Sequence, residues 1–407
     1  MDLITAAIPA FFIFIALELS YGLAKGNNTY RLNDSINSLS MGTLSTLAKL
    51  VFFDVSIVLF NWLAQQAQLW QWSQNWATWA FGFVAYDFFY YWFHRISHER
   101  NIFWASHVAH HQSEDFNLTT ALRQTGTGFI CSWVFFVPLF VAGFPPQMFY
   151  TIAAVNLLYQ FWVHTEHIRK LGWYEWIFVT PSNHRVHHAR NPVYIDKNYG
   201  GVFCLWDRMF GTFQPELDFQ KCEYGISKTL DSWNPLWANL HVYYTMLKTS
   251  WQSRYWPDKF KVWFMSPAWQ PHDGETPVYK ELGAAKYDPL VPRLWQAYAA
   301  AQFVVLMILN SYIAFAAAGM SAVLLWLGFG YCLLSLVATG FILEYRSAGL
   351  YLDLLRLLAV CIAFFLAPLQ LAPLLMLAIL CYVFASLAWN LRLLRAFVWQ
   401  PQQIGDT

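Results

Sequence analysis

Charged residues are scarce in this sequence. Lys, Arg, Asp and Glu make up 12% of its 407 residues, whereas 57% are hydrophobic. An average soluble protein carries about 25% charged residues, so this chain lacks the ions that would cover a water-facing surface. Its net charge is only +1, whereas nucleic-acid binding needs a clustered basic surface. The composition therefore argues against a soluble protein and against a nucleic-acid partner.

Paired cysteines are also missing. The six cysteines are scattered and form no Cys-x-x-Cys pair, so the sequence predicts neither a disulfide framework nor a thiolate metal site. The N-terminal stretch "MDLITAAIPAFFIFIALEL" has no basic flank and no evident cleavage site. We therefore expect a retained membrane helix there rather than a signal peptide.

Long apolar runs are abundant. A membrane-spanning helix needs about 20 mostly apolar residues, and the sequence offers nine candidates: 3–24, 42–63, 75–93, 128–143, 147–163, 297–317, 321–343, 348–367 and 371–390. They predict an all-α integral membrane protein, a multi-span helical bundle. We expect four parts: N-terminal membrane helices (1–75), a histidine-rich domain (76–230), an aromatic-rich interfacial segment (231–294) and C-terminal membrane helices (295–407).

Basic residues indicate how these helices are oriented. Lys25, Arg95, Arg169, Arg293 and Arg346 each lie beside the end of an apolar run. Loops that carry Lys and Arg usually stay in the cytosol. Nine spans with the N-terminus outside place all of these residues there. The same count places every histidine-rich stretch on the cytosolic side, where stretches distant in sequence are free to converge.

Ten of the twelve histidines fall into four short groups with helical spacing. These are His94 and His98, then His107, His110 and His111, then His164 and His167, and finally His184, His187 and His188. Residues three or four apart share one helix face. Ten imidazoles suit two metal ions with five ligands each, and imidazole is a ligand for iron, zinc, copper and nickel. His167 is either a ligand or a residue behind the ligands.

Three polar residues are candidates for catalytic roles. Glu99 adjoins His98, and the alternative for it is a surface charge. Asp87 precedes His94 by seven residues and is placed to orient a ligating ring through its second nitrogen; otherwise it pairs with a nearby base. Asn117 is placed to hold a lipid head group or a ligating histidine, with ordinary loop structure as the alternative.

Residues 231–269 hold six tryptophans among Lys and Arg. Tryptophan is enriched where the membrane meets water. We therefore expect amphipathic segments that lie in the interface, cap the histidine-rich domain and border a lipid entrance.

The histidine motifs carry a family resemblance. HxxxH, HxxHH and a final HxxHH among membrane helices resemble the fatty acid hydroxylase and sterol desaturase superfamily of membrane di-iron oxygenases. The segments "HRISHERNIFWASHVAHHQSEDFNLTTALRQ", "FWVHTEHI", "TPSNHRVHHARNPVYIDKNYGG" and "WDRMFGTF" are most similar to its alkylglycerol monooxygenase branch. The resemblance covers about residues 1–270, and the C-terminal helices also fit that branch.

The resemblance implies a function. A cytosolic di-iron domain over residues 76–230 would activate O2 and hydroxylate the carbon beside an ether oxygen of a membrane lipid. The hemiacetal product would collapse to a fatty aldehyde and a glycerol lipid. Tetrahydrobiopterin or another electron donor would supply the electrons, and a second copy of the chain is a further candidate partner.

Two alternatives remain open. One is another reaction of the same superfamily, such as sterol desaturation or hydroxylation of a different lipid or fatty acid. The other is a metal transporter. Transport sites lie near the bilayer midplane on broken helices, whereas these histidines stand beside basic residues at helix ends.

Overall fold

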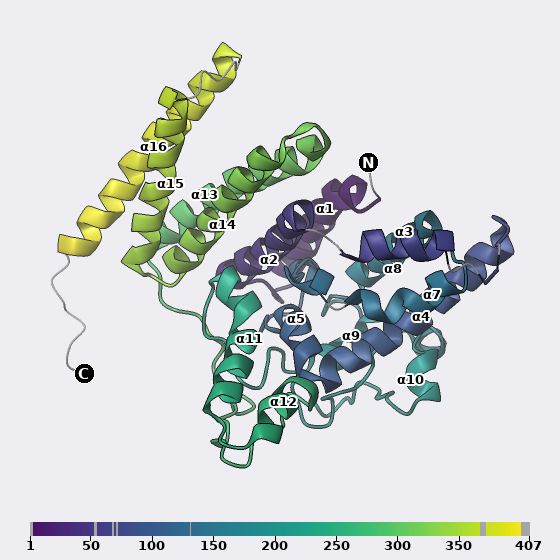
Figure 1. Ribbon diagram of the computed structural model, residues 1–407. Helices are drawn as coiled ribbons and strands as arrows, with labels where there is room; N and C mark the ends of the chain where they lie inside the picture. The colour runs from purple at the N-terminus through teal and green to yellow at the C-terminus, as the bar shows by residue number, and fades with distance from the viewer. Residues whose placement is uncertain are drawn as a thin grey trace. The chain divides into compact units, whose positions relative to one another are not determined.

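The structure is a computed structural model that describes residues 3–52, 55–66, 69–70, 72–130, 132–366 and 372–399 (Figure 1). These residues form helices and loops, and their only β-type pairings are two isolated bridges, Phe178 with Phe203 and Ala189 with Tyr224. The predicted all-α fold class is confirmed.

The described chain divides into two compact units. The first comprises the residues up to Ser45, Phe52–Leu230 and Asn239–Lys286, and the second comprises Thr46–Val51, Asp231–Ala238 and the residues from Tyr287 onward. The first unit holds α1 (Leu3–Ala24), most of α2 (Leu32–Val51), α3 (Val55–Gln66), α4 (Trp76–Glu99), α5 (Asn101–His111), α6 (Leu118–Ala121), η1 (Gly128–Ile130), η2 (Ser132–Phe136), α7 (Val137–Val141), α8 (Pro146–Trp162), η3 (Gly172–Trp176), α9 (Pro181–His188), α10 (Leu205–Met209), most of α11 (Pro235–Gln252) and α12 (Trp256–Phe264). The second unit holds α13 (Arg293–Ala316), η4 (Ala317–Gly319), α14 (Ala322–Leu343), α15 (Ser347–Leu366) and α16 (Pro373–Trp399).

Four helices are long and apolar enough to cross a membrane, or five if one bent pair counts as a span. The four are Leu3–Ala24, Arg293–Gly319, Ala322–Leu343 and Pro373–Val398, and the bent pair is Leu32–Val51 with Ser56–Gln66. Multi-span membrane character is thus confirmed, but the predicted count of nine was too high for the described residues. Residues 53, 54, 131, 367 and 371 of the predicted spans lie outside them.

Several apolar runs fold differently from a spanning helix. Run 128–143 breaks into η1, η2 and α7, and run 147–163 gives α8 with only 17 residues. Helix α4 is long enough to span a membrane, but its mean hydropathy is too low because it is rich in tryptophan, tyrosine and polar residues. Hydropathy does not distinguish an aromatic protein core from a segment that faces lipid, and this explains the excess in the count.

Aromatic packing fixes α4 in the first unit. The rings of Phe60 and Phe140 stack with centroids 3.9 Å apart, and Tyr86 of α4 stacks on Phe136 at 5.0 Å. A Cβ atom at Gly82 would lie 2.1 Å from the ring of Phe144, so only glycine permits this approach. Burying one such ring contributes about 1.5–3 kcal/mol. The cluster therefore holds α4 firmly while its C-terminal turns carry the first histidines.

A sharp turn reverses the chain after α4. Arg100 leaves the helical region (φ −129°, ψ 124°), so that α4 ends at Glu99 and α5 begins at Asn101. The two helices then pack against each other. This turn brings the HxxxH pair of α4 opposite the HxxHH triplet of α5.

Helix α9 carries the last HxxHH triplet and begins with a strong cap. The Thr180 side chain accepts from the backbone N–H of Asn183, the Asn183 side chain returns the bond to Thr180, and Pro181 occupies the first helical turn. Such a capping box satisfies N–H groups that would otherwise be unpaired. All eight residues of the helix are buried.

The second unit contains a buried ion pair. The Arg356 guanidinium donates to the Asp353 carboxylate at 2.8 Å, and both side chains are almost fully buried. Asn390 donates to the same carboxylate at 2.8 Å, and Tyr298 also donates to it. Gln302 accepts from Arg356. Residues of α13, α15 and α16 are thereby joined through one polar network.

Candidate metal centre

Nine of the ten predicted histidines gather into two neighbouring groups. The five-histidine group consists of His94, His98, His107, His111 and His187, and the four-histidine group consists of His110, His164, His184 and His188. In each group every residue offers one ring nitrogen within 4.8 Å of all the others. Stretches separated by up to 94 positions in the chain therefore meet at one place.

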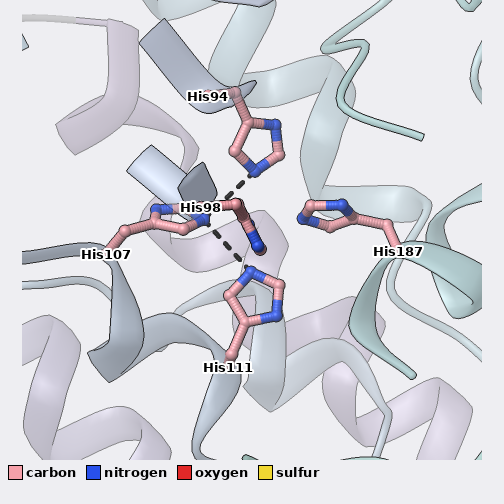
Figure 2. Close-up of side chains that lie close together, drawn as sticks. All are labelled: His94, His98, His107, His111 and His187. Carbon is pink, nitrogen blue, oxygen red and sulfur yellow. Dashed lines mark hydrogen bonds between the residues drawn. The ribbon is translucent and has the colours of Figure 1, made fainter. Parts of the chain in front are cut away.

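In the five-histidine group the rings of three helices converge on one centre. Figure 2 shows His94 and His98 of α4, His107 and His111 of α5, and His187 of α9 pointing toward one another. The Nε2 atom of His107 lies 3.1 Å from the Nε2 atoms of both His94 and His111. The His98 and His187 Nε2 atoms are buried and form no hydrogen bond.

The four-histidine group is built in the same way. The Nε2 atom of His164 lies 3.0 Å from that of His184 and 3.3 Å from that of His110. His188 and His184 are 3.2 Å apart through the same atoms. The rings of His111 and His188 stack with centroids 4.3 Å apart, so the two groups are direct neighbours.

Backbone carbonyls fix the orientation of four rings. The Nδ1 atoms of His94, His110, His164 and His187 lie 2.8–3.0 Å from the carbonyl oxygens of Tyr199, Arg123, Gln160 and Lys197, respectively. A carbonyl only accepts, so Nδ1 must carry the proton and Nε2 must present its lone pair. This is how proteins commonly orient metal-ligating histidines.

The electrostatics of the groups favour neutral rings. Burial lowers the pKa of His94 to about 3 and that of His110 to about 4. Burial also lowers the pKa of His98, His164 and His187 well below the usual value. Neutral imidazole is the form that binds a metal. The Nε2 lone pairs of His110 and His164 face each other at 3.3 Å with both Nδ1 atoms donating to carbonyls. Such an arrangement fits a shared cation, so the donor set suits a metal site.

A loop after α9 supplies two of these carbonyls, and Asp87 fixes that loop. The Asp87 carboxylate accepts from the backbone N–H groups of Val202 and Phe203 at 2.9 and 3.0 Å, from the indole of Trp206 and from Asn156. It therefore reaches neither a histidine ring nor a basic side chain. Seven residues span about 10 Å along a helix, too far for direct contact with His94, so the predicted direct contact was wrong.

The loop also depends on close approach of its backbone. A Cβ atom at Gly201 would lie 2.8 Å from the ring of Tyr90 and 2.9 Å from Asp87. Asp207 accepts from the N–H groups of Tyr199 and Gly200 at 2.7 and 2.8 Å. Together these contacts place the Tyr199 carbonyl that orients His94.

The structure does not bring three other predicted residues to the histidine groups. The ring of His167 packs edge-on against Tyr21, with centroids 5.2 Å apart, because α8 ends at Trp162 and the assumed helical spacing to His164 is lost. Glu99 pairs with Arg95 at 2.8 Å. Asn117 caps α6 and donates to the carbonyl of Thr29.

The sequence carries no signal for the carbonyl acceptors. Gln160, Lys197 and Arg123 act here through backbone oxygens that every residue type has. Only the fold shows which of them lie beside a histidine.

Comparison with known proteins places these features in a family. The model of the fatty acid hydroxylase family matches residues 79–212, which include all nine grouped histidines. Alkylglycerol monooxygenase of Xenopus tropicalis is 38% identical over 364 residues, covering 88% of this chain and 81% of the relative. The human enzyme is 36% identical over 365 residues, with coverage of 88% and 81%. The Danio rerio enzyme is 38% identical over 366 residues, with coverage of 87% and 80%. No solved structure matches the chain. With its histidine groups inside the matched domain, the chain belongs to the alkylglycerol monooxygenase family.

Proposed function

We propose that the nine histidines hold two iron ions and that the protein uses them to hydroxylate the carbon beside the ether oxygen of an alkylglycerol lipid. The family makes the chain an oxygen-dependent lipid monooxygenase. The transporter alternative receives no support from these relatives, which are named as oxygenases. The observation that carries the proposal is the division of nine ring nitrogens into two adjacent sets.

The adjacency of the two groups supports a pair of ions. His111 and His188, which stack on each other, belong to different groups. Bound there as a ferrous pair, the metal would activate O2 for insertion of one oxygen atom into a C–H bond. The chain's part is to hold the ring nitrogens in place through the carbonyls of Tyr199, Arg123 and Gln160.

Phe116 shields the four-histidine group. Its fully buried ring lies with centroids 5.5 Å from His164 and 5.2 Å from His188. An apolar ring there excludes water from the side of the site that it covers. Exclusion of water favours transfer of oxygen to the lipid over release of reduced oxygen.

The overall reaction requires an external reductant. One lipid molecule, one O2, two electrons and two protons give the hydroxylated ether and one water. The hydroxylated carbon then loses the ether oxygen as an alcohol and becomes an aldehyde. We assign the electrons to a two-electron organic donor of the tetrahydrobiopterin type, as the resemblance implies.

The histidine groups would face the cytosol. Helix α1 docks onto the histidine-rich part of the first unit, since Glu18 accepts from the backbone N–H of Leu118 at 2.8 Å and from Thr165, the neighbour of His164. Lys25 and Arg31 follow the same end of α1. Basic residues next to a span favour the cytosolic side. An N-terminal epitope tag should accordingly be accessible from outside the cytosol in sealed membranes.

The activity test uses the full chain in membranes or detergent. After anaerobic loading with ferrous iron, addition of O2, a reduced pterin and an O-alkylglycerol should yield fatty aldehyde, and His187→Ala should yield none. Oxidation of a different membrane lipid without aldehyde from the ether lipid would overturn the substrate assignment. A fully active His187→Ala variant would overturn the ligand assignment.

A further inference from the structure

Helices α11 and α12 expose an apolar stripe that the metal centre does not use. On α11 the exposed residues recur at intervals of four, three and four, and on α12 at intervals of four, so each set occupies one helix face. The aromatic stripe consists of Leu240, Tyr244, Leu247, Trp251, Trp256, Phe260 and Phe264. Trp251 is 87% exposed and Trp256 is 71% exposed. Large apolar side chains exposed on successive turns of one helix face indicate contact with a partner or a membrane.

The opposite faces of the same helices are firmly packed. Met246 of α11 and Val262 of α12 form a buried cluster with Ala105 of α5. Asn101, the first residue of α5, donates through its backbone to the carbonyl of Met265 and through its side chain to that of Val262, both at 2.9 Å. The stripe is therefore held rigidly on the helix that carries His107, His110 and His111.

The exposed charged residues beside the aromatic stripe are mostly basic. Lys248, Arg254 and Lys261 are exposed. Of the acidic residues beside them, Asp258 is buried and accepts from the backbone and ring of His272 at 2.9 and 2.8 Å. Asp273 is exposed and accepts from the backbone of Arg254 at 2.8 Å, so three basic residues face one exposed carboxylate. Lys261 also lies 3.8 Å from Asp258, but its side chain is nearly half exposed.

We propose that the aromatic stripe lies in the interfacial layer of an anionic phospholipid leaflet, with its rings at head-group depth and Lys248, Arg254 and Lys261 beside lipid phosphates. Large aromatic rings flanked by lysine and arginine are typical of helices that lie in the membrane surface. Lysine is depleted at protein–protein interfaces, which makes a second copy of the chain the poorer match. This contact goes beyond the proposed reaction because it sets the depth of α5, and hence of the metal centre, relative to the lipid.

Depth can be measured directly on the full chain. In the test protein an environment-sensitive fluorescent amino acid replaces Phe264. In the control protein it replaces Val278, which is 88% exposed in the loop after α12. Both proteins are placed in nanodiscs of phosphatidylcholine and phosphatidylserine, with or without lipids brominated near the head group. Brominated lipid should quench the label at 264 by about half or more, and the label at 278 little, if the stripe is interfacial.

A charge variant tests the basic residues. Lys248→Glu, Arg254→Glu and Lys261→Glu combined should reduce quenching at 264 in discs that contain phosphatidylserine, because each basic residue near an anionic surface contributes about fivefold in affinity. In discs of phosphatidylcholine alone the same variant should change the quenching much less. Equal quenching for variant and parent in both lipids would overturn the anionic assignment.

Two outcomes overturn the interfacial contact itself. One is absence of quenching at 264 in a protein that retains its metal content. The other is energy transfer between copies labelled at 264 without quenching by lipid, which would assign the stripe to an oligomer interface. Metal content serves as the folding control, and neither readout depends on which lipid is oxidised.

Discussion

His110 and His164 face each other through ring nitrogens that cannot share a proton. The Nδ1 atom of His110 donates to the carbonyl of Arg123 and that of His164 to the carbonyl of Gln160, and the two Nε2 atoms lie 3.3 Å apart. Both lone pairs point into the same space. A cation between them satisfies both rings, and this relationship is the physical basis of the metal assignment.

Removal of one of these rings should empty the four-histidine group. We expect His164→Gln to lose about one of two metal ions, consistent with the coupling of ligand loss to metal loss, and to lose activity. The matched control is His167→Gln, three residues away but packed against Tyr21. Metal analysis of both purified variants checks this, and equal loss in both would contradict the assignment.

Asp87 should act through the loop that it holds. In Asp87→Asn an amide N–H replaces an acceptor for the N–H groups of Val202 and Phe203, which should lower the free energy of unfolding by about 1–3 kcal/mol. Activity should fall as well, because the Tyr199 carbonyl shifts. Asp218→Asn, which breaks only an exposed pair with Lys170, should stay near the parent. Thermal unfolding and an activity assay measure the two effects. If Asp87→Asn has the stability and activity of the parent, Asp87 does not hold the loop as described.

Helix geometry explains which parts of this site the sequence could predict. The HxxxH and HxxHH spacings put ligands on one helix face wherever the helix persists, and α4, α5 and α9 do persist. His167 failed as a predicted ligand because α8 ends before it. Asp87 was placed correctly near the site, but its partners Val202 and Phe203 lie more than one hundred positions away, which local spacing does not encode.

The membrane topology was less predictable than the site. Aromatic runs that pack around Phe60, Tyr86 and Phe140 read in sequence like lipid-facing helices. The buried pair of Asp353 and Arg356 lies in a run that reads as purely apolar apart from these two charges. Hydropathy reports the nature of side chains but not whether protein or lipid surrounds them.

Acid should destabilise the metal-free protein through the buried rings. The pKa of His110 is about 4 in the folded chain, because of burial, against 6.5 as its ordinary value. Between these values the unfolded chain binds more protons, so the stabilising contribution is complete above pH 6.5 and is lost as pH falls toward 4. A shift of this size corresponds to about 3 kcal/mol.

Thermal unfolding of chelator-treated protein at a series of pH values measures this loss. His110→Gln should reduce the slope of the pH dependence by the contribution of this one ring, whereas His241→Gln, outside both groups, should leave the slope unchanged. If the unfolding temperature of the parent protein does not decrease as the pH is lowered from 6.5 to 4, the prediction is contradicted.

Removing one partner of the ion pair in the second unit should cost more stability than replacing both partners by apolar residues. Arg356→Met leaves the Asp353 carboxylate buried without its guanidinium and should cost about 3–5 kcal/mol. Asp353→Leu combined with Arg356→Met should recover much of that loss. The exposed Arg392→Met is the matched control. Thermal unfolding of each variant in detergent compares their stabilities. If Arg356→Met unfolds at the same temperature as the parent, the polar network contributes no stability.

The most direct test of the central claim is the iron content of the full chain after anaerobic reconstitution with ferrous iron. The proposed function predicts two iron ions per chain, one for each of the two histidine groups, and loss of both when His164→Gln and His187→Ala are combined. A single ion per chain, or two ions that remain in the combined variant, would contradict it.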